Sequence, residues 1–144
     1  MPETASKSVA MVVSDFNDEI TGRMQAMAES EAKAAGVHIA KVLHVPGVLD
    51  MPLVCAMLLE RDDVDGVVAL GCVLKGETGH DELVAHTCAR QLSDLSIEFA
   101  KPVAFGVIGP GATHTQATAR SDDYAKRAVR AAAVLIDVLQ EIEG

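Results

Sequence analysis

The sequence has no tryptophan, one tyrosine and three phenylalanines, so aromatic residues make up only 3% of its 144 positions. Basic residues are also scarce, because 12 lysines and arginines stand against 21 aspartates and glutamates, for a net charge of −9. A field of that sign repels nucleic-acid phosphates and anionic lipid head groups. We therefore expect no binding to nucleic acid and no docking on a membrane surface.

Long hydrophobic runs are missing as well, because every apolar stretch is far shorter than the ~20 residues that span a bilayer. Residues 1–4 lack the basic region that opens a signal peptide. The three cysteines, Cys55, Cys72 and Cys88, lie in apolar surroundings without Cys-x-x-Cys spacing, which favours small core residues over ligands or nucleophiles. These absences predict a soluble, unprocessed cytoplasmic chain.

What is present is the composition of one globular domain over residues 1–144, with 49% hydrophobic and 23% charged residues. Residues 8–13, 67–73 and 102–108 are uninterrupted apolar runs, which predict central strands buried on both faces of a parallel sheet. Residues 37–45 contain interspersed polar side chains and predict a strand nearer the edge.

The segments between these predicted strands have apolar residues at helical spacing. Ile20, Met24 and Met27 follow one helical stripe, residues 83–92 repeat it, Pro52 opens a short helix over 53–59, and a last helix runs from about Asp122 to Ile142. Alternating strands and helices predict right-handed βαβ units. The fold class is α/β: a three-layer α/β/α sandwich of the flavodoxin-like kind, with a roughly four-stranded parallel sheet.

In such a sheet the ligand crevice lies at the carboxyl ends of the strands, and the unusual residues follow those ends. Phe16 either offers a face for stacking on a flat heterocycle or, taken alone, pins its loop. Backbone N–H groups in residues 76–81, where Thr78-x-x-Asp81 is typical of a capping box, can hold a phosphate. His80 then stands beside that turn as a proton donor and acceptor or as an ordinary surface histidine.

Two further side chains have two readings each, and a third has one. Asp50 can accept hydrogen bonds from sugar-like hydroxyls or cap the second helix. Arg120 suits a phosphate or lies solvated, and Lys126 belongs by pattern to a solvated face. The histidines share no metal-ligand spacing, so we expect no metal.

Four segments in order carry a family resemblance. They are Phe16-Asn17-x-x-Ile20-Thr21; Val45-Pro46-Gly47-x-x-Asp50-x-Pro52; Gly71-x-Val73-Leu74-x-Gly76-x-Thr78-x-His80; and Pro102-Val103-Ala104-Phe105-Gly106 with Gln116-Ala117 and Arg120. Over nearly its whole length the chain resembles the lumazine synthase family of riboflavin biosynthesis, and residues 109–111 resemble its archaeal branch. Leu49 stands where many members have an aromatic residue, and Asp50 replaces the more frequent glutamate.

The resemblance implies condensation of 5-amino-6-(D-ribitylamino)uracil with 3,4-dihydroxy-2-butanone 4-phosphate, giving 6,7-dimethyl-8-ribityllumazine, phosphate and water, without cofactor or metal. It also implies pentamers, possibly closed into a 60-subunit shell, with active sites between neighbouring subunits. Two alternatives remain open on sequence: the related archaeal riboflavin synthase, which needs no phosphate site, and a non-catalytic protein that binds a flavin-like ring or forms a shell.

The same resemblance implies roles for individual residues. His80 moves protons. The pyrimidine and ribityl groups contact Phe16, Val48, Leu49, Asp50, Cys72, Val73, Leu74 and Phe105, and the phosphate contacts Glu77, Thr78, Arg120 and Lys126.

Overall fold

The computed structural model describes residues 6–76 and 79–144. Over these residues four parallel strands form one sheet in the order β2-β1-β3-β4. The strands are β1 (Lys7–Ser14), β2 (Val37–Val45), β3 (Gly66–Leu74) and β4 (Val103–Ala112), and the helices are α1 (Asp18–Ala34), α2 (Met51–Leu59), α3 (His80–Phe99) and α4 (His114–Glu143). A single 3-10 turn, η1 (Val48–Asp50), precedes α2.

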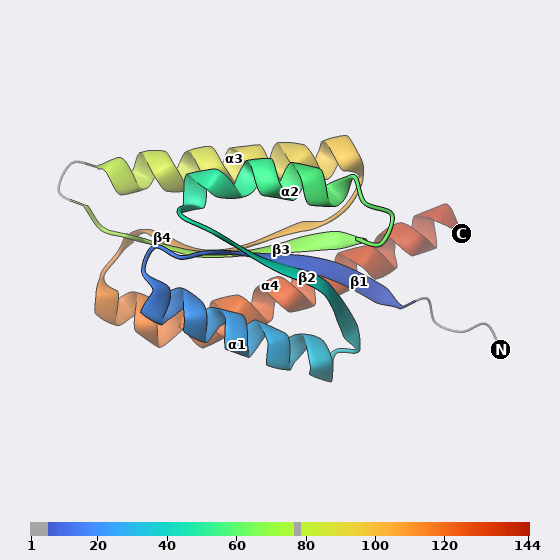
Figure 1. Cartoon of the computed structure of the whole chain (residues 1–144), viewed down its shortest axis with the longest axis horizontal. Coiled ribbons are helices and arrows are strands. Elements are labelled where there is room, and N and C mark those ends of the chain that lie inside the picture. The colour runs from blue at the N-terminus through green and yellow to red at the C-terminus, as the bar shows by residue number, and fades with distance from the viewer. Residues whose placement is uncertain (1–5, 77–78) are drawn as a thin grey trace.

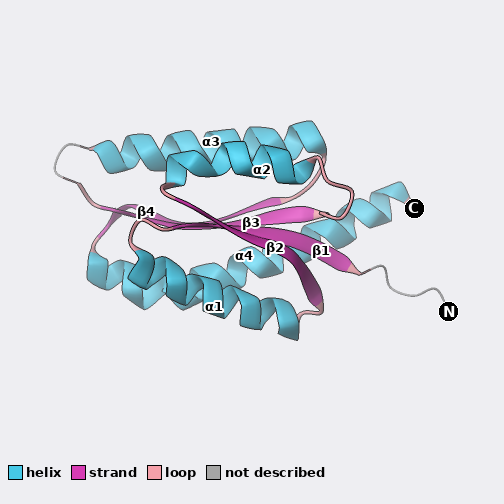
Figure 2. Ribbon diagram, viewed as in Figure 1, coloured by secondary structure: helices cyan, strands magenta, loops and turns pink. Residues whose placement is uncertain are grey.

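The helices form one layer on each face of the sheet: α1 and α4 cover one face, and α2 and α3 cover the other (Figures 1 and 2). The pleat of β1 divides its apolar residues between the two layers, since Met11 and Val13 pack on the α1 and α4 side while Ala10 and Val12 pack on the α2 and α3 side. The predicted three-layer α/β/α sandwich is confirmed. Continuous apolar runs are the expected sequence pattern of strands buried in this way.

One strand lies elsewhere in the sheet than expected. Residues 102–108 were expected to form a central strand, but β4 is an edge strand, because in the described part of the chain it pairs with β3 alone. Helices α3 and α4 cover it from both faces, so its residues are apolar although one side of the strand is unpaired. Phe105 is 38% exposed there. The prediction that β2 lies at an edge is confirmed.

Helix α4 begins earlier than the predicted Asp122. The Thr113 hydroxyl accepts a hydrogen bond from the Gln116 backbone N–H (3.1 Å), and the Gln116 side-chain oxygen accepts one from the Thr113 N–H (3.0 Å). This reciprocal capping box starts the helix at His114. The first turns escaped prediction because their buried residues, Ala117 and Ser121, are small and leave a weak apolar stripe.

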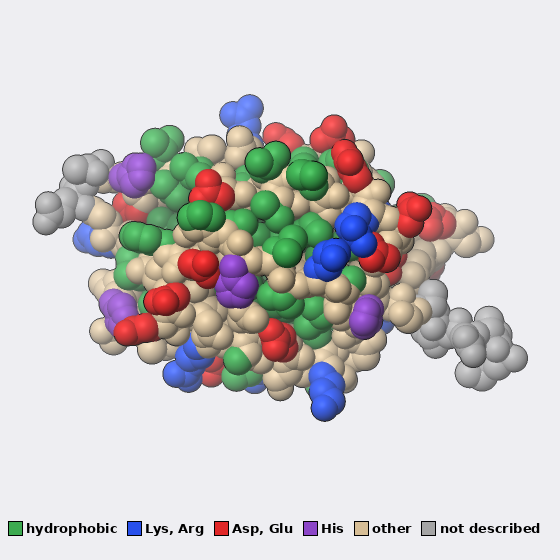
Figure 3. Space-filling view, in the orientation of Figure 1, with side chains coloured by type: hydrophobic (Ala, Val, Ile, Leu, Met, Phe, Trp, Pro, Cys, Tyr) green, Lys and Arg blue, Asp and Glu red, His purple; other side chains and the backbone are tan. Residues whose placement is uncertain are grey.

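The side chains of Cys55, Cys72 and Cys88 are all buried, which confirms their prediction as core residues. Other apolar side chains remain at the surface. In the view of Figure 3 hydrophobic side chains gather over α2, where Leu53 and Met57 are 72% and 66% exposed. Within residues 6–76 and 79–144, the helices are all too short or too polar to cross a bilayer.

Candidate active site

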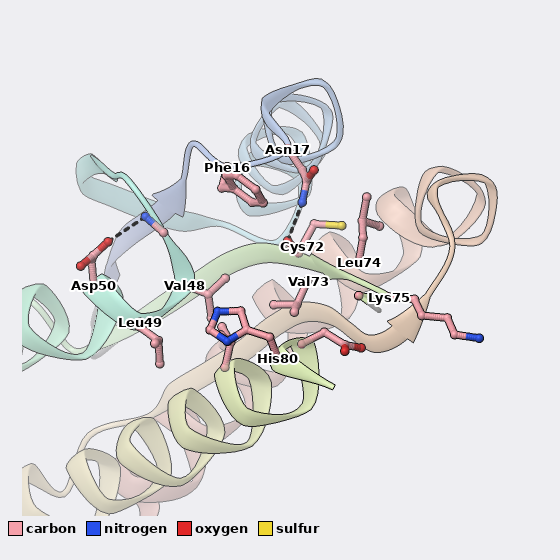
Figure 4. Close-up of a pocket in the computed structure, with 14 residues that line it drawn as sticks. Phe16, Asn17, Val48, Leu49, Asp50, Cys72, Val73, Leu74, Lys75 and His80 are labelled. Carbon is pink, nitrogen blue, oxygen red and sulfur yellow. Dashed lines mark hydrogen bonds between the residues drawn. The ribbon is translucent and has the colours of Figure 1, made fainter. Parts of the chain in front are cut away.

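A cavity of about 550 Å³ opens at the carboxyl ends of β1 and β3, between the loop before α1, the η1 turn and the start of α3 (Figure 4). Its volume is that of a site for a drug-sized ligand. Four chain segments supply the lining residues: Phe16 and Asn17; Gly47, Val48, Leu49 and Asp50; Cys72, Val73, Leu74, Lys75 and Gly76; and His80, Asp81 and Val84.

The loop between β1 and α1 presents Phe16 to this cavity. The Phe16 N–H donates to the Pro46 carbonyl (3.0 Å), and the Phe16 side chain is 70% exposed. Next to it, Asn17 has a left-handed backbone (φ 67°), which asparagine tolerates better than most residues. The Asn17 side-chain amide donates to the Cys72 carbonyl at 3.0 Å (Figure 4). Asn17 thus fastens the loop that carries Phe16 to the end of β3.

Sequence reasoning gave Asn17 no role of its own. The available signal was an asparagine in a loop directly before a helix, a position where left-handed conformations are common.

The η1 turn forms a second wall of the cavity. Val48 is 5% exposed and Leu49 is 45% exposed, so Val48 belongs to the core while Leu49 faces solvent. The Asp50 carboxylate accepts a hydrogen bond from the Gly47 N–H at 2.9 Å. Asp50 makes no side-chain cap for α2, so the helix-capping reading is wrong: the carboxylate closes the preceding turn instead. The Asp50 side chain therefore folds back onto the backbone of Gly47, three residues earlier.

The end of β3 forms the floor of the cavity with Cys72, Val73 and Leu74. Burial raises the pKa of the Cys72 thiol to about 11, so the thiol is neutral at pH 7 and unsuited to act as a nucleophile. Its carbonyl is already engaged by Asn17. Lys75 donates its backbone N–H to the Ala112 carbonyl (2.8 Å), and Figure 4 shows its side chain directed away from His80.

His80 is the first residue of α3, which agrees with its predicted place in the first turn of this helix. Its side chain lines the cavity together with Val48 and Val73 and is exposed to solvent (Figure 4). Glu77 and Thr78, two of the four predicted phosphate contacts, lie outside the described residues. Next along the helix, Asp81 is 6% exposed and accepts a hydrogen bond from the Gly111 N–H at 2.9 Å. Sequence reasoning had placed Asp81 only in a capping box.

The structure does not bring all predicted residues together. Phe105 lines a separate cavity of about 330 Å³ with Tyr124 and Arg127, on the α4 side of the sheet. Arg120 and Lys126 belong to α4, and neither lines the cavity that contains His80. Arg120 is solvent-exposed. The described chain therefore divides the predicted residues between two surfaces.

The chain is similar in sequence to known proteins over nearly its full length. A sequence model of the 6,7-dimethyl-8-ribityllumazine synthase family matches residues 6–141. The 6,7-dimethyl-8-ribityllumazine synthase of Staphylothermus marinus is 52% identical, over 94% of this chain and 90% of the relative. The proteins of the same name from Methanocaldococcus jannaschii and Sulfolobus acidocaldarius are 46% identical (94% of this chain, 96% of the relative) and 47% identical (99% and 90%).

The family match covers every residue that lines the two cavities and every strand of the sheet. The chain belongs to the 6,7-dimethyl-8-ribityllumazine synthase family.

Proposed function

We propose that this protein condenses 5-amino-6-(D-ribitylamino)uracil with 3,4-dihydroxy-2-butanone 4-phosphate to 6,7-dimethyl-8-ribityllumazine, phosphate and water. The observation that carries the proposal is the cavity at the carboxyl ends of β1 and β3, which is lined by both Phe16 and His80. The family match over residues 6–141 includes every residue of this lining. As a metabolic enzyme with free thiols in the described part of the chain, it is proposed to work in the cytoplasm.

The lining of the cavity suits the pyrimidine substrate. Phe16 is largely exposed and held by its backbone, so its ring offers a face on which a flat heterocycle stacks. Val48 and Val73 supply an apolar wall, and the Asp50 carboxylate stands at the edge, where ribityl hydroxyls can donate to it. The site needs little covalent help beyond this, because holding two reactants together is itself a large rate effect.

His80 serves the proton transfers of the condensation. When the pyrimidine amine attacks the ketone carbonyl, the nitrogen loses protons and the oxygen leaves as water. The carbon next to the imine then loses a proton as phosphate departs as an anion, and the enol that results becomes a ketone. The ribityl-bearing nitrogen attacks this ketone, and ring closure releases a second water. A histidine side chain can accept and return a proton near neutral pH, and general acid–base help of this kind contributes typically ~10²–10⁴ in rate.

The positively charged groups that bind the phosphate come, in this proposal, from a second copy of the chain. Arg120, Lys126 and Phe105 lie off the His80 cavity, while a phosphate that leaves from that cavity calls for a cation beside it. A ring of subunits supplies them if the α4 surface of one subunit faces the cavity of the next. Exposed apolar side chains on α4, namely Val134, Leu135 and Val138, support a contact between copies through this helix, because exposed apolar patches mark interaction sites. We propose a pentamer, either free or joined with eleven others in a closed 60-subunit shell.

The reaction is tested by giving the purified protein the diaminouracil and the butanone phosphate together, and separately 6,7-dimethyl-8-ribityllumazine alone. Fluorescent lumazine formed only from the pair supports the proposal. Riboflavin formed from lumazine alone would identify a riboflavin synthase instead. Binding of the pyrimidine without any product would identify a non-catalytic ligand-binding protein.

The shared site is tested by complementation between His80→Ala and Arg120→Ala chains co-assembled in equal amounts. A site is intact when the histidine comes from an Arg120→Ala chain and the arginine from a His80→Ala chain. The chance is about ½ × ½, so activity should rise to roughly a quarter of wild type for a heterologous ring contact. Variants assembled separately and then mixed without exchange serve as the control. Activity at the parental average in rings shown to be mixed by mass spectrometry would place both residues in one subunit's site.

A further inference from the structure

Asp81 is the one carboxylate among the buried residues of the described chain, with 6% of its surface exposed. It is the second residue of α3, directly after His80, and it lines the cavity. Charged side chains are seldom buried without partners, because the charged form loses its hydration. The position therefore requires groups that stabilise the carboxylate.

Those groups are backbone N–H groups from three segments. The Asp81 Oδ2 atom accepts a hydrogen bond from the Gly111 N–H at 2.9 Å, across 30 residues of sequence. The Oδ1 atom faces Gly76, where a Cβ added to the glycine would lie 3.8 Å from it. The Gly111 N–H contributes most to a lowered pKa of Asp81, and the backbone at Gly76, Asp81 and Glu82 lowers it further. The carboxylate is thus ionised and surrounded by donors.

The consequence is mechanical. One side chain connects the segment after β3 at Gly76, the first turn of α3 with His80, and the end of β4 at Gly111. A carboxylate whose oxygens already accept from N–H donors is a poor proton acceptor for a substrate, so Asp81 is not the base of the reaction. The negative charge of Asp81 would also repel a substrate phosphate if the carboxylate oxygens pointed at that phosphate. The remaining role for Asp81 is to orient the neighbouring backbone.

We propose that Asp81 is a positioning residue, which holds the Gly76 backbone and the first turn of α3 against the end of β4 so that the cavity can receive a phosphomonoester substrate. This inference rests on the proposed function, because the phosphorylated substrate is defined there. It adds a residue that contacts neither the reacting atoms nor the pyrimidine.

The test compares Asp81→Asn with Glu82→Gln. An asparagine side chain has one oxygen acceptor and one NH2 donor, so it must turn the NH2 group towards either Gly111 or Gly76, both of which offer N–H donors. Glu82→Gln removes the same charge one residue later, from an exposed side chain. We expect Asp81→Asn to raise KM for the butanone phosphate about tenfold, the size of one charge-assisted hydrogen bond, with KM for the pyrimidine changed less than twofold.

Asp81→Glu provides the second variant, because it keeps the charge and both oxygen acceptors on a longer stem. Its KM for the butanone phosphate should lie between those of the wild type and Asp81→Asn. If the asparagine variant does not fold, Asp81→Glu alone is compared with the wild type. Equal increases in both KM values, or equal effects of Asp81→Asn and Glu82→Gln, would overturn the proposal. A wild type without turnover would instead refute the proposed function, and Asp81 would then be tested by binding of inorganic phosphate to wild type and both Asp81 variants.

Discussion

Replacing Gly71 with alanine should move one wall of the active-site cavity. Gly71 lies in β3, and a Cβ added there would stand 2.8 Å from the Val48 Cγ2 atom, 3.1 Å from the Ser14 hydroxyl oxygen and 3.5 Å from the Met51 methyl carbon. Carbon atoms pack best at about 3.5–4.0 Å, so Val48 must retreat by roughly 1 Å. Val48 has a stiff, β-branched side chain and is buried, which leaves the η1 turn to absorb the shift.

The expected cost follows from overpacking, which typically destabilises a core by about 1–3 kcal/mol. Removing a glycine from a strand returns about 0.5–1 kcal/mol. We therefore expect the free energy of unfolding to fall by about 1–2 kcal/mol for Gly71→Ala. Because Val48 lines the cavity, kcat/KM for the pyrimidine should fall about tenfold, within the ~10²-fold loss that a 1 Å misplacement can cause.

Urea unfolding gives the stability change, and initial rates at varied pyrimidine concentration give kcat/KM. The matched control is Gly22→Ala in α1, where the added Cβ has no described atom within 4 Å apart from its chain neighbours and the nearby backbone of its own helix. That variant should gain about 0.5–1 kcal/mol with unchanged kinetics, because alanine is the better helix former. Our reasoning would be refuted if Gly71→Ala matched the wild type in stability and rate, or if both variants lost stability equally.

Three further substitutions test the site and the frame around it. His80→Ala should lower kcat by ~10²-fold or less, because positioned substrates retain much of the rate advantage. Steady-state or stopped-flow rates measure this decrease, and complete loss of activity with unchanged substrate binding would mean that His80 does more than transfer protons. Arg120→Ala should raise KM for the butanone phosphate about 10- to 150-fold and leave the pyrimidine KM nearly unchanged, whereas equal increases would place the arginine in subunit contact. Lys101→Met removes an ammonium group that donates to the Leu59 carbonyl (2.8 Å) and the Arg61 carbonyl (3.0 Å) at the end of α2. Urea unfolding should show that the free energy of unfolding falls by about 1–2 kcal/mol, whereas an unchanged value would mean that water replaces the ammonium group.

The sequence alone determined the class of fold and one side of the site. Strands buried on both faces must be apolar throughout, and helices that cover them must repeat apolar residues every three or four positions, so both patterns are readable without coordinates. Parallel strands also bring their carboxyl ends to one edge. That rule was enough to place Phe16, Asp50 and His80 at a common cavity, whereas Cys72 was assigned to it only through the family resemblance.

The tertiary structure decided what depends on neighbours distant in sequence. An apolar run reports the covered faces of a strand and not its lateral partners, so β4 could be recognised as a strand but not as an edge. The Asn17 amide meets the Cys72 carbonyl 55 residues away, and Asp81 meets Gly111 across 30 residues. Neither pair is marked by a local sequence pattern, because each depends on which strands are neighbours in the sheet. The same order places Arg120 on the far layer from His80, a separation that no periodicity encodes.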